Sequence, residues 1–281
     1  MKNLFIAICL FIAFSASSQY RSDISLLTDN EWINKDLDYI RFHNDTVVYN
    51  ISNNKQELLF DVEKRKLHIK TSYRVAGELK YETFEFNIKQ LQKDRLVIEP
   101  SEKEKDKITA YRKIEVNPLL KEKQYIFYNR GQLVSRVNFK KITFHSSTCF
   151  GLCPSVSVEV NNDGSIFYNG RTYSGLEGNY EGKMDAKTLL ELRKMLNNSQ
   201  LYVLDQKWKQ LTSPNDQPRY NYIIELTDGR LIQINTNDQH PILDSLSEFL
   251  INIHKKASLT KATGKHNFEI STIEDYRVTL N

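Results

Sequence analysis

The chain has 281 residues, of which 40% are hydrophobic and 26% charged, and a formal net charge of +4. This composition allows a packed core, and the length suits one large domain or two ordinary ones. Its basic residues are interspersed with acidic ones and form no stripe, which argues against a nucleic-acid-binding protein. The 15 tyrosines and 14 phenylalanines favour β structure.

Residues 1–18 have the pattern of a removable secretory signal. A basic second residue precedes an apolar run at 4–14, which is too short to span a bilayer, and Ala16 and Ser18 are small residues before a cleavage site. The residue before Cys9 is not the small one that a lipoprotein signal needs. We expect a protein exported to the periplasm or cell envelope of a Gram-negative bacterium, or secreted, with no transmembrane segment.

Seven short runs with β-strand character follow, and turn-forming Asn and Asp residues separate several of them. Seven strands in about ninety residues predict an antiparallel sandwich or a small barrel. The runs are 39–42, 46–50, 57–62, 67–73, 81–88, 95–99 and 108–114.

Leu27 and Trp32 open this segment, and the motifs IRFHNDT at 40–46, NIKQL at 87–91, LVI at 96–98 and ITAYRK at 108–113 follow. With these motifs, the segment resembles bacterial lipocalin-like domains. The resemblance implies an up-and-down β-sheet that is closed or nearly closed on itself, with a filled core or a ligand pocket inside. We therefore expect a lipocalin-like β domain over 19–116 and a linker over 117–135.

The region 136–256 predicts a second domain that begins with strands. We expect a short strand at 142–144 and an alternating strand at 154–160, whose valines share one face. Asn162-Asp163-Gly164 predicts a hairpin turn to a strand at 165–168, because Gly readily adopts positive φ. Asn169-Gly170 is a second such signal and suggests a third strand at 171–173.

Two helices and a further hairpin complete this domain. Asp185 is a suitable N-cap for a helix whose leucines repeat at helical spacing, and Pro241 suits the first turn of a second helix. Asp228-Gly229 predicts a hairpin between them, and the glycine-rich run 175–182 fits no phosphate-binding motif and predicts a loop. The order β-β-β-α-β-β-α predicts an α+β domain with helices packed on an antiparallel sheet. A polar tail at 257–281 completes the chain, with 276–280 suited to an edge strand.

The stretch between residues 142 and 253 contains several short motifs: Cys149-Phe150-Gly151-Leu152-Cys153-Pro154, Asp163-Gly164, Tyr168-Asn169-Gly170, Asp216-Gln217-Pro218, Asp228-Gly229 and Pro241. With these motifs, this part of the chain resembles an uncharacterised family of exported bacterial proteins. Ser155-Val156 departs from the family, which commonly has an aliphatic–aromatic pair there. The resemblance implies domain limits and export but no activity.

Cys149 and Cys153 are predicted to form a disulfide, because an exported chain matures in an oxidising space and Gly151 gives the turn between them its freedom. A redox role needs a thiolate stabilised by a helix N-terminus or by nearby cations, and the following element is predicted to be a strand. His145 and the two cysteines also have the spacing of a metal set, but a fourth ligand is not evident. The other histidines of the mature chain occur singly and are expected to be ordinary surface or helix-end residues.

No local signature of a hydrolase or metalloenzyme occurs, so we expect neither enzyme activity nor a cofactor or metal. In the simplest interpretation, the Asp216 side chain caps its own turn. In a functional interpretation, it forms a polar patch with Arg219 that faces residues 148–154, which we call the cysteine turn. We expect a non-catalytic binding or interaction module for a protein or a small apolar ligand. The alternatives are a small-ligand carrier that uses a cavity of the first domain, and a thiol-redox or hydrolytic enzyme. The candidate binding face consists of Phe150, Gly151, Pro154, Asp216, Pro218 and Arg219.

Overall fold

The computed structural model describes residues 24–105, 117–207, 217–237 and 239–269. The chain divides into two compact units, one ending at Leu133 and the other beginning at Val134. The expected signal at 1–18, the strand at 108–114 and the edge strand at 276–280 lie outside the described residues. In the ranges that are described, no helix has the length and hydropathy needed to cross a membrane.

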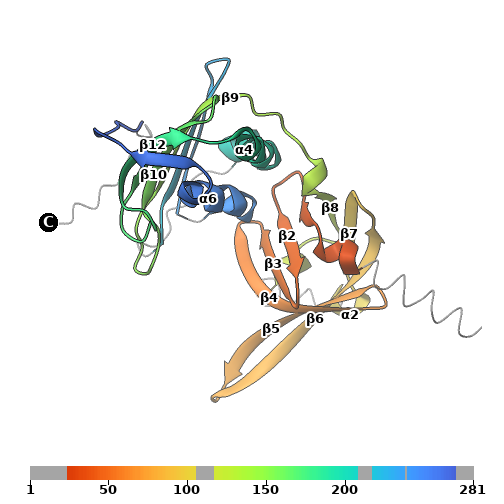
Figure 1. Cartoon of the computed structure of the whole chain (residues 1–281). Coiled ribbons are helices and arrows are strands. Elements are labelled where there is room, and N and C mark those ends of the chain that lie inside the picture. Colours follow the sequence, from red (N-terminus) through yellow and green to blue (C-terminus); the bar gives the residue numbers. More distant parts are fainter. Residues whose placement is uncertain (1–23, 106–116, 208–216, 238, 270–281) are drawn as a thin grey trace, which may run out of the picture. The chain divides into compact units, whose positions relative to one another are not determined.

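The first unit is a closed antiparallel barrel in which each strand pairs with the next and β1 pairs with β8 (Figure 1). The predicted β-rich fold is confirmed, and the closed eight-stranded barrel is compatible with the lipocalin-like expectation. Its strands are β1 (Glu31–Ile33), β2 (Tyr39–His43), β3 (Thr46–Ile51), β4 (Asn54–Glu63), β5 (Lys66–Val75), β6 (Glu78–Leu91), β7 (Arg95–Pro100) and β8 (Tyr125–Asn129), and a short helix, α2 (Glu102–Lys105), follows β7.

Large apolar side chains fill the barrel, because alternate residues of each strand point inward. The 3-10 turn η1 (Pro118–Leu120) adds Leu119 and Leu120 to the same cluster, and the Tyr125 hydroxyl donates to the Pro118 carbonyl at 3.0 Å. The side chains of the described residues therefore fill the interior of the barrel. The fully buried aromatic members are Trp32, Phe42, Tyr49, Phe84, Phe86 and Phe127.

Strand β8 lies within residues 117–135, where the sequence suggested a linker. Its side chains alternate between buried and half-buried, and it pairs with both β1 and β7. It therefore closes the barrel, and the first unit extends to Leu133 instead of ending at 116. The short strand β1 was also missed.

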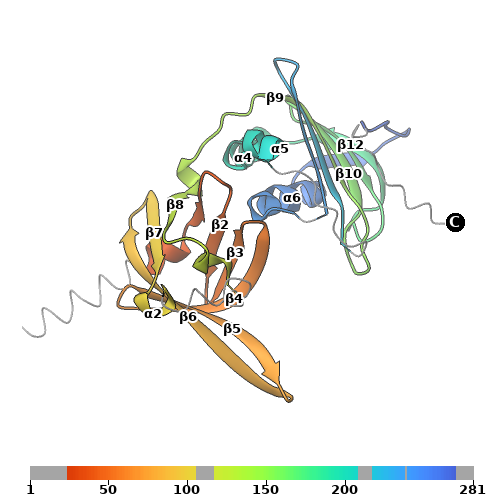
Figure 2. The ribbon, with the colours of Figure 1, turned by 180° about the vertical axis from the view of Figure 1, so that it is seen from behind.

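Strands β5 and β6 continue past their neighbours as a two-stranded ribbon that projects from the barrel (Figures 1 and 2). Residues 71–75 pair with 78–82, whereas β4 reaches only to Lys70 and β7 begins to pair at Phe86. Ala76 and Gly77 form the turn with φ of 53° and 87°. Two successive positive φ values are what a tight hairpin of this twist requires.

The second unit is a seven-stranded antiparallel sheet in the order β14-β13-β9-β10-β11-β12-β15, with helices against one face (Figure 2). This confirms the predicted α+β architecture. The strands are β9 (Phe139–Ser146), β10 (Val156–Asn161), β11 (Ser165–Gly170), β12 (Gly178–Lys183), β13 (Tyr220–Leu226), β14 (Leu231–Thr236) and β15 (Ser258–Lys261). The helices are α4 (Ala186–Asn198), α5 (Leu201–Lys207) and α6 (Asp244–Ile251), with 3-10 turns at Pro241–Leu243 and Ile253–Lys255.

The alternation of apolar and polar residues along β10 determines which face of this sheet the helices cover. Val156, Val158 and Val160 are fully buried on the helix side, where α6 lies close to β10 and α4 lies close to α6. Ser157 and Glu159 therefore point to the opposite face. Asp185 caps α4 as predicted, its side chain accepting from the Thr188 amide at 2.7 Å.

The predicted position of the strand that follows β11, residues 171–173, was wrong. Gly170 is the last residue of β11 and not part of a tight two-residue turn. Residues 171–177 connect β11 to the third strand, β12, most of which lies in the predicted glycine-rich loop. A Cβ on Gly170 would lie 1.9 Å from the Leu176 carbonyl oxygen. This glycine therefore permits a close backbone approach. Helix α5 and the tail strand β15 were also not predicted.

Candidate functional site

A row of polar side chains crosses the sheet face opposite the helices. Directly paired residues of antiparallel strands share a face, and the pairing places one polar residue on each of six neighbouring strands. The polar row consists of Asn235, Asn221, His145, Ser157, Asn169 and Asn179, from β14 to β12.

Residues 262–269 cross this same face after β15, and we call them the C-terminal strap. The His266 ring stacks on Phe167 with centroids 3.9 Å apart, and its Nε2 lies 3.2 Å from Glu159 Oε2. Further along, the Glu269 carbonyl accepts from His145 Nε2 at 2.9 Å. The strap therefore covers part of β11, β10 and β9 and buries the Glu159 carboxylate, which is 7% exposed.

A pocket of about 720 Å³ lies between the strap and the end of the sheet that carries the cysteine turn. This volume is within the range of small-molecule sites. Its walls come from residues 145–148, Ser155, Arg171, Arg219, Asn221 and 266–268. Among these described lining residues there are two arginines, two histidines and several hydroxyl and amide groups, but no carboxylate.

Neutral acceptors hold the Arg171 guanidinium in place. Nε donates to Ser155 Oγ, and Nη1 donates to Ser157 Oγ and to Asn169 Oδ1, all at 2.9 Å. Nη2 makes a longer bond of 3.4 Å to the Ser146 carbonyl. An arginine has five N–H donors, two of them on Nη2. One donor on Nη2 is therefore not used by these protein contacts.

The charge of Arg171 has no carboxylate counterpart among the described residues. The residue as a whole is exposed, but its guanidinium lies against the polar row, and partial burial lowers the pKa of Arg171 from its usual value. The group stays protonated, because arginine does not lose its proton in proteins. It therefore places a fixed positive charge at the pocket wall.

Asn221 gives the pocket a second polar group without a partner. Asn221 is 7% exposed, its side-chain Oδ1 is buried without a hydrogen bond, and no described residue bonds to its side-chain amide group. A buried polar group that is left unpaired costs free energy, so such a group at a pocket wall favours a ligand or ordered water as its partner.

The comparison with known protein families concerns this second unit. Residues 140–257 match the model of a domain of unknown function, DUF6438. No curated protein and no solved structure matches the chain. The match is consistent with the predicted likeness of residues 142–253 to a family without an assigned activity.

The DUF6438 segment begins in β9 and ends just before β15, so it covers less than half of the chain. It contains the pocket residues on β9 and β13, including Asn221, and those in the loops that follow β9 and β11, including Arg171. The strap residues His266, Asn267 and Phe268 lie after it. The pocket therefore combines the matched domain with a segment outside the match.

The cysteine turn of the DUF6438 segment borders this pocket. The Sγ atoms of Cys149 and Cys153 lie 1.97 Å apart, at disulfide distance, in agreement with the prediction. Ser146 Oγ donates to the Pro154 carbonyl at 2.7 Å, which joins the two ends of the turn. Phe150 and Leu152 point outward and are 96% and 77% exposed.

The predicted binding face overlaps the pocket at one position. Arg219 lines the pocket, whereas Phe150, Gly151, Pro154 and Pro218 do not, and Asp216 lies outside the described residues. The Arg219 amide donates to Ser147 Oγ at 2.8 Å, which ties β13 to the beginning of the cysteine turn. In the sequence, His145 suggested only a metal ligand, and Arg171, Asn221 and the strap gave no signal, because these residues are remote in sequence and come together only in the folded sheet.

His145 is not a metal ligand together with the cysteines, as these are paired with each other. Among the described residues, no group of three or more His, Cys, Asp and Glu side chains has the geometry of a metal site. Instead, His145 Nδ1 lies 2.8 Å from Ser157 Oγ. Its Nε2 carries a hydrogen, since the Glu269 carbonyl can only accept.

The Ser157–His145 contact is a structural one. Ser157 is 5% exposed and is not among the pocket-lining residues, and its oxygen already accepts from Arg171. A serine nucleophile needs access to its substrate, which this serine lacks. The pair therefore serves to fix Arg171 and the imidazole ring.

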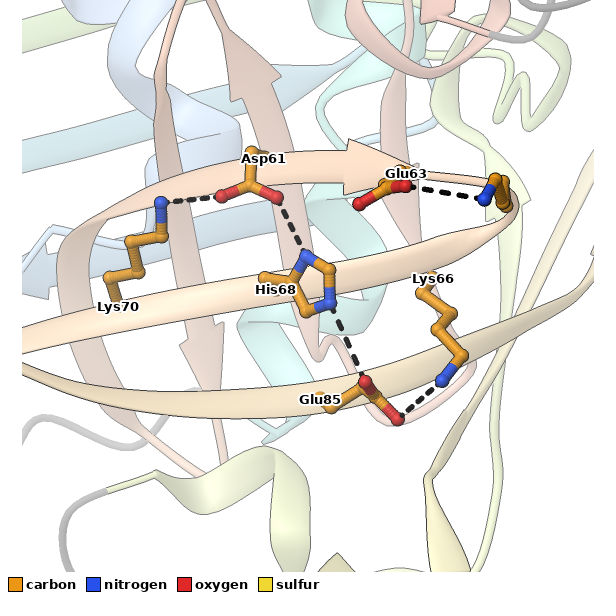
Figure 3. A network of polar contacts seen from close by, with 7 residues as sticks. Asp61, Glu63, Lys66, His68, Lys70 and Glu85 are labelled. Carbon is orange, nitrogen blue, oxygen red and sulfur yellow. Dashed lines mark hydrogen bonds and ion pairs between the residues drawn. The ribbon is translucent and has the colours of Figure 1, made fainter. Parts of the chain in front are cut away.

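A second polar cluster lies on the outside of the barrel (Figure 3). His68 Nδ1 is 2.6 Å from Asp61 Oδ1, and its Nε2 is 3.5 Å from Glu85 Oε2. Lys70 pairs with Asp61 at 2.5 Å and Lys66 with Glu85 at 3.1 Å. Hydrogen bonds from these lysines are the main cause that lowers the pKa values of Asp61 and Glu85. The cluster is a network of acidic and basic side chains across β4, β5 and β6.

Proposed function

We propose that the protein is an exported, non-catalytic binding protein whose ligand site is the pocket between the C-terminal strap and the cysteine turn. The observation that carries this proposal is the pocket itself, about 720 Å³ in volume and lined by polar groups from segments far apart in sequence. A concave site with a few converging polar groups is typical of small-molecule binding.

Export is supported by the N-terminal sequence and by the cysteine pair. Residues 1–18 have the composition of a secretory signal, and the sulfurs of Cys149 and Cys153 lie at disulfide distance. Disulfides persist mainly in oxidising compartments. Both features fit a protein of the periplasm, the cell envelope or the extracellular space.

A non-catalytic role is supported by how the three serine hydroxyls that line the pocket are used. Ser146, Ser147 and Ser155 each donate to a backbone carbonyl, at 2.7, 3.0 and 3.2 Å. None of them therefore presents its proton to a base, as a serine nucleophile does. These groups shape the wall of a binding site.

The barrel is the less favoured location for a ligand. Aromatic side chains occupy its interior, and the η1 turn adds two buried leucines. A carrier with an apolar cavity in the first unit would need this core to open, whereas the pocket in the second unit is already formed.

A second candidate function is protein interaction through the cysteine turn. Phe150 is 96% exposed and Leu152 is 77% exposed at the tip of a cross-linked loop. Large apolar side chains held outward in this way are typical of contact residues. A Phe150→Ser, Leu152→Ser protein would lose a partner in this case but would keep any pocket ligand.

Native mass spectrometry of the protein purified from a Gram-negative periplasm tests the first proposal. We expect a small molecule to co-purify with the wild type and to be lost in Asn267→Trp, which places a bulky ring at the pocket wall. Lys194→Trp on the exposed part of α4 is the matched control and should retain it. Retention of the ligand in Asn267→Trp, or a wild type without ligand that also binds nothing in a small-molecule library, would contradict the proposal.

A further inference from the structure

We infer that the pocket selects a small ligand carrying a carboxylate or phosphate group, which binds to Arg171 while a second polar group of the ligand reaches Asn221. This inference rests on the proposed ligand site and adds the chemical class of the ligand. Its basis is the guanidinium of Arg171, which bonds to Ser157 and Asn169 of the polar row without a carboxylate partner, and the unpaired buried side-chain oxygen of Asn221 in the same row.

The charges of the described lining residues favour an anionic ligand over a cationic one. Its described lining residues include Arg171 and Arg219 and no carboxylate. Two carboxylates at the strap are already paired, Glu159 with the lining residue His266 at 3.2 Å and Glu269 with Lys141 at 2.9 Å. A cation would therefore meet a like charge at the wall, and an anion would meet an opposite charge in a partly desolvated place, where electrostatic attraction is stronger.

Arg171 is oriented for an oxyanion before any ligand arrives. Its contacts to Ser155, Ser157 and Asn169 use three of its five donors at 2.9 Å. These acceptors are neutral, so they fix the plane of the group without cancelling its charge. The remaining donor on Nη2 is available for a charge-assisted hydrogen bond, which is the stronger kind of hydrogen bond.

The position of Asn221 gives the length of the ligand. Arg171 bonds to Ser157 on β10, His145 on β9 lies directly opposite Ser157, and Asn221 on β13 lies directly opposite His145. Two strand spacings therefore separate the two polar groups, or about 10 Å. A ligand with its anionic group at Arg171 would place a hydroxyl or amide at Asn221.

The strap contributes an aromatic wall. His266 and Phe268 both line the pocket, and their rings meet edge to face with centroids 4.8 Å apart. This surface suits an apolar or ring-shaped middle part of the ligand. An organic anion therefore fits the pocket better than a bare inorganic ion.

Ligand-detected NMR with matched pairs of probes tests the charge selection. Benzoate and benzamide have nearly the same shape and differ in charge, and phenyl phosphate and phenol form a second pair. At constant ionic strength, we expect each anion to bind at least about tenfold more tightly than its neutral counterpart, the difference that one charge-assisted hydrogen bond provides. Comparison of the two anions separates a carboxylate site from a phosphate site.

Two variants locate the effect. Arg171→Gln should lower the affinity for the anions about tenfold or more, and Asn221→Asp should do the same by adding a negative charge without changing the shape. The second variant keeps every Arg171 contact, so it remains informative if Arg171→Gln unfolds, which circular dichroism would show. Arg193→Gln, an exposed arginine on α4, is the control with the same charge change and should bind as the wild type.

Equal binding of benzoate and benzamide, no binding of either anion to the folded wild type, or full anion binding by Asn221→Asp would overturn the inference. These results are distinct from failure of the proposed function. A neutral or cationic natural ligand that Asn267→Trp displaces would leave the proposed site intact and refute only the anion selection.

Discussion

Arg171 and Ser157 are joined by a hydrogen bond of 2.9 Å in which guanidinium Nη1 donates to the serine oxygen. Ser157 also contacts His145, and His145 contacts the strap at the Glu269 carbonyl. The positive charge at the pocket wall is thus connected through two side chains to the segment that covers the sheet. Pocket and strap form one polar assembly on the face without helices.

Gly170→Ala should destabilise the second unit by about 2–3 kcal/mol, as overpacking does elsewhere. The added methyl group would lie 1.9 Å from the Leu176 carbonyl oxygen and 2.6 Å from Ser174 Oγ, so the 171–177 loop must move. Urea unfolding measures the change. Gly264→Ala is the control, because nothing lies within 4 Å of its Cβ, and equal stability of the two variants would contradict the account.

Replacement of both cysteines, Cys149→Ser and Cys153→Ser, should lower the free energy of unfolding by about 2 kcal/mol and leave the fold intact. The loop that the bond closes is short, so its removal releases little chain entropy. Urea unfolding with and without a reductant measures this, and the reductant should affect only the wild type. An unfolded double variant would show that the bond holds the whole domain together.

His266→Ala should loosen the strap without unfolding the sheet. The substitution removes the ring stack on Phe167 and the contact to Glu159, of which the stack is worth about 1 kcal/mol. We expect faster amide exchange and faster chymotrypsin cleavage within residues 262–269. His43→Ala, at an exposed barrel position, should change neither, and an unchanged strap in His266→Ala would refute the packing role of the ring.

The first unit should lose stability in acid through Asp61 and Glu85. Both pKa values are lowered in the folded protein, mainly by hydrogen bonds from Lys70 and Lys66. A lowered pKa stabilises the fold above the unfolded value of about 4, and this contribution is lost as the pH falls through the folded value. The pairs are partly exposed, so each is worth less than about 1 kcal/mol.

Hydrogen exchange of the backbone amides in peptides from β4 to β6, measured between pH 7 and pH 2, tests this effect. The exchange rates are corrected for the intrinsic pH dependence of amide exchange, so that the remaining change reports the stability of the fold. Asp61→Asn and Glu85→Gln should be less stable than the wild type at pH 7 and should show a weaker acid dependence. Glu57→Gln on β4 is an exposed control and should follow the wild type. A wild-type acid dependence that survives in Asp61→Asn, Glu85→Gln would locate the effect elsewhere.

Much of the fold was readable from local patterns. The alternation at Val156, Val158 and Val160 identified the buried face of β10, and Gly164 and Gly229 adopt φ of 87° and 86° at the predicted hairpin turns. Strand β8 was missed because it is short and closely follows Pro118 and the charged residues 121–123. Asn169-Gly170 misled the prediction, because its glycine serves a close backbone approach and not a turn.

The candidate site was much less predictable. The cysteine motif predicted a binding face at Phe150 and Asp216, but the pocket lies beside the cysteine turn, on the sheet face. The register between β13, β9 and β10 brings His145 and Asn221 together, and the pairing of β10 with β11 brings in Arg171, which follows β11; no single segment encodes this arrangement. The strap adds a further element from a tail without sequence periodicity.

Hydrogen-exchange mass spectrometry with the small-molecule fraction of a periplasmic extract tests the central claim most directly. If the pocket is the ligand site, protection from exchange should increase at residues 145–148, around Asn221 and at 266–268, and the barrel strands should not change. Protection confined to β1–β8, or to the exposed tip at Phe150 and Leu152, would contradict the account.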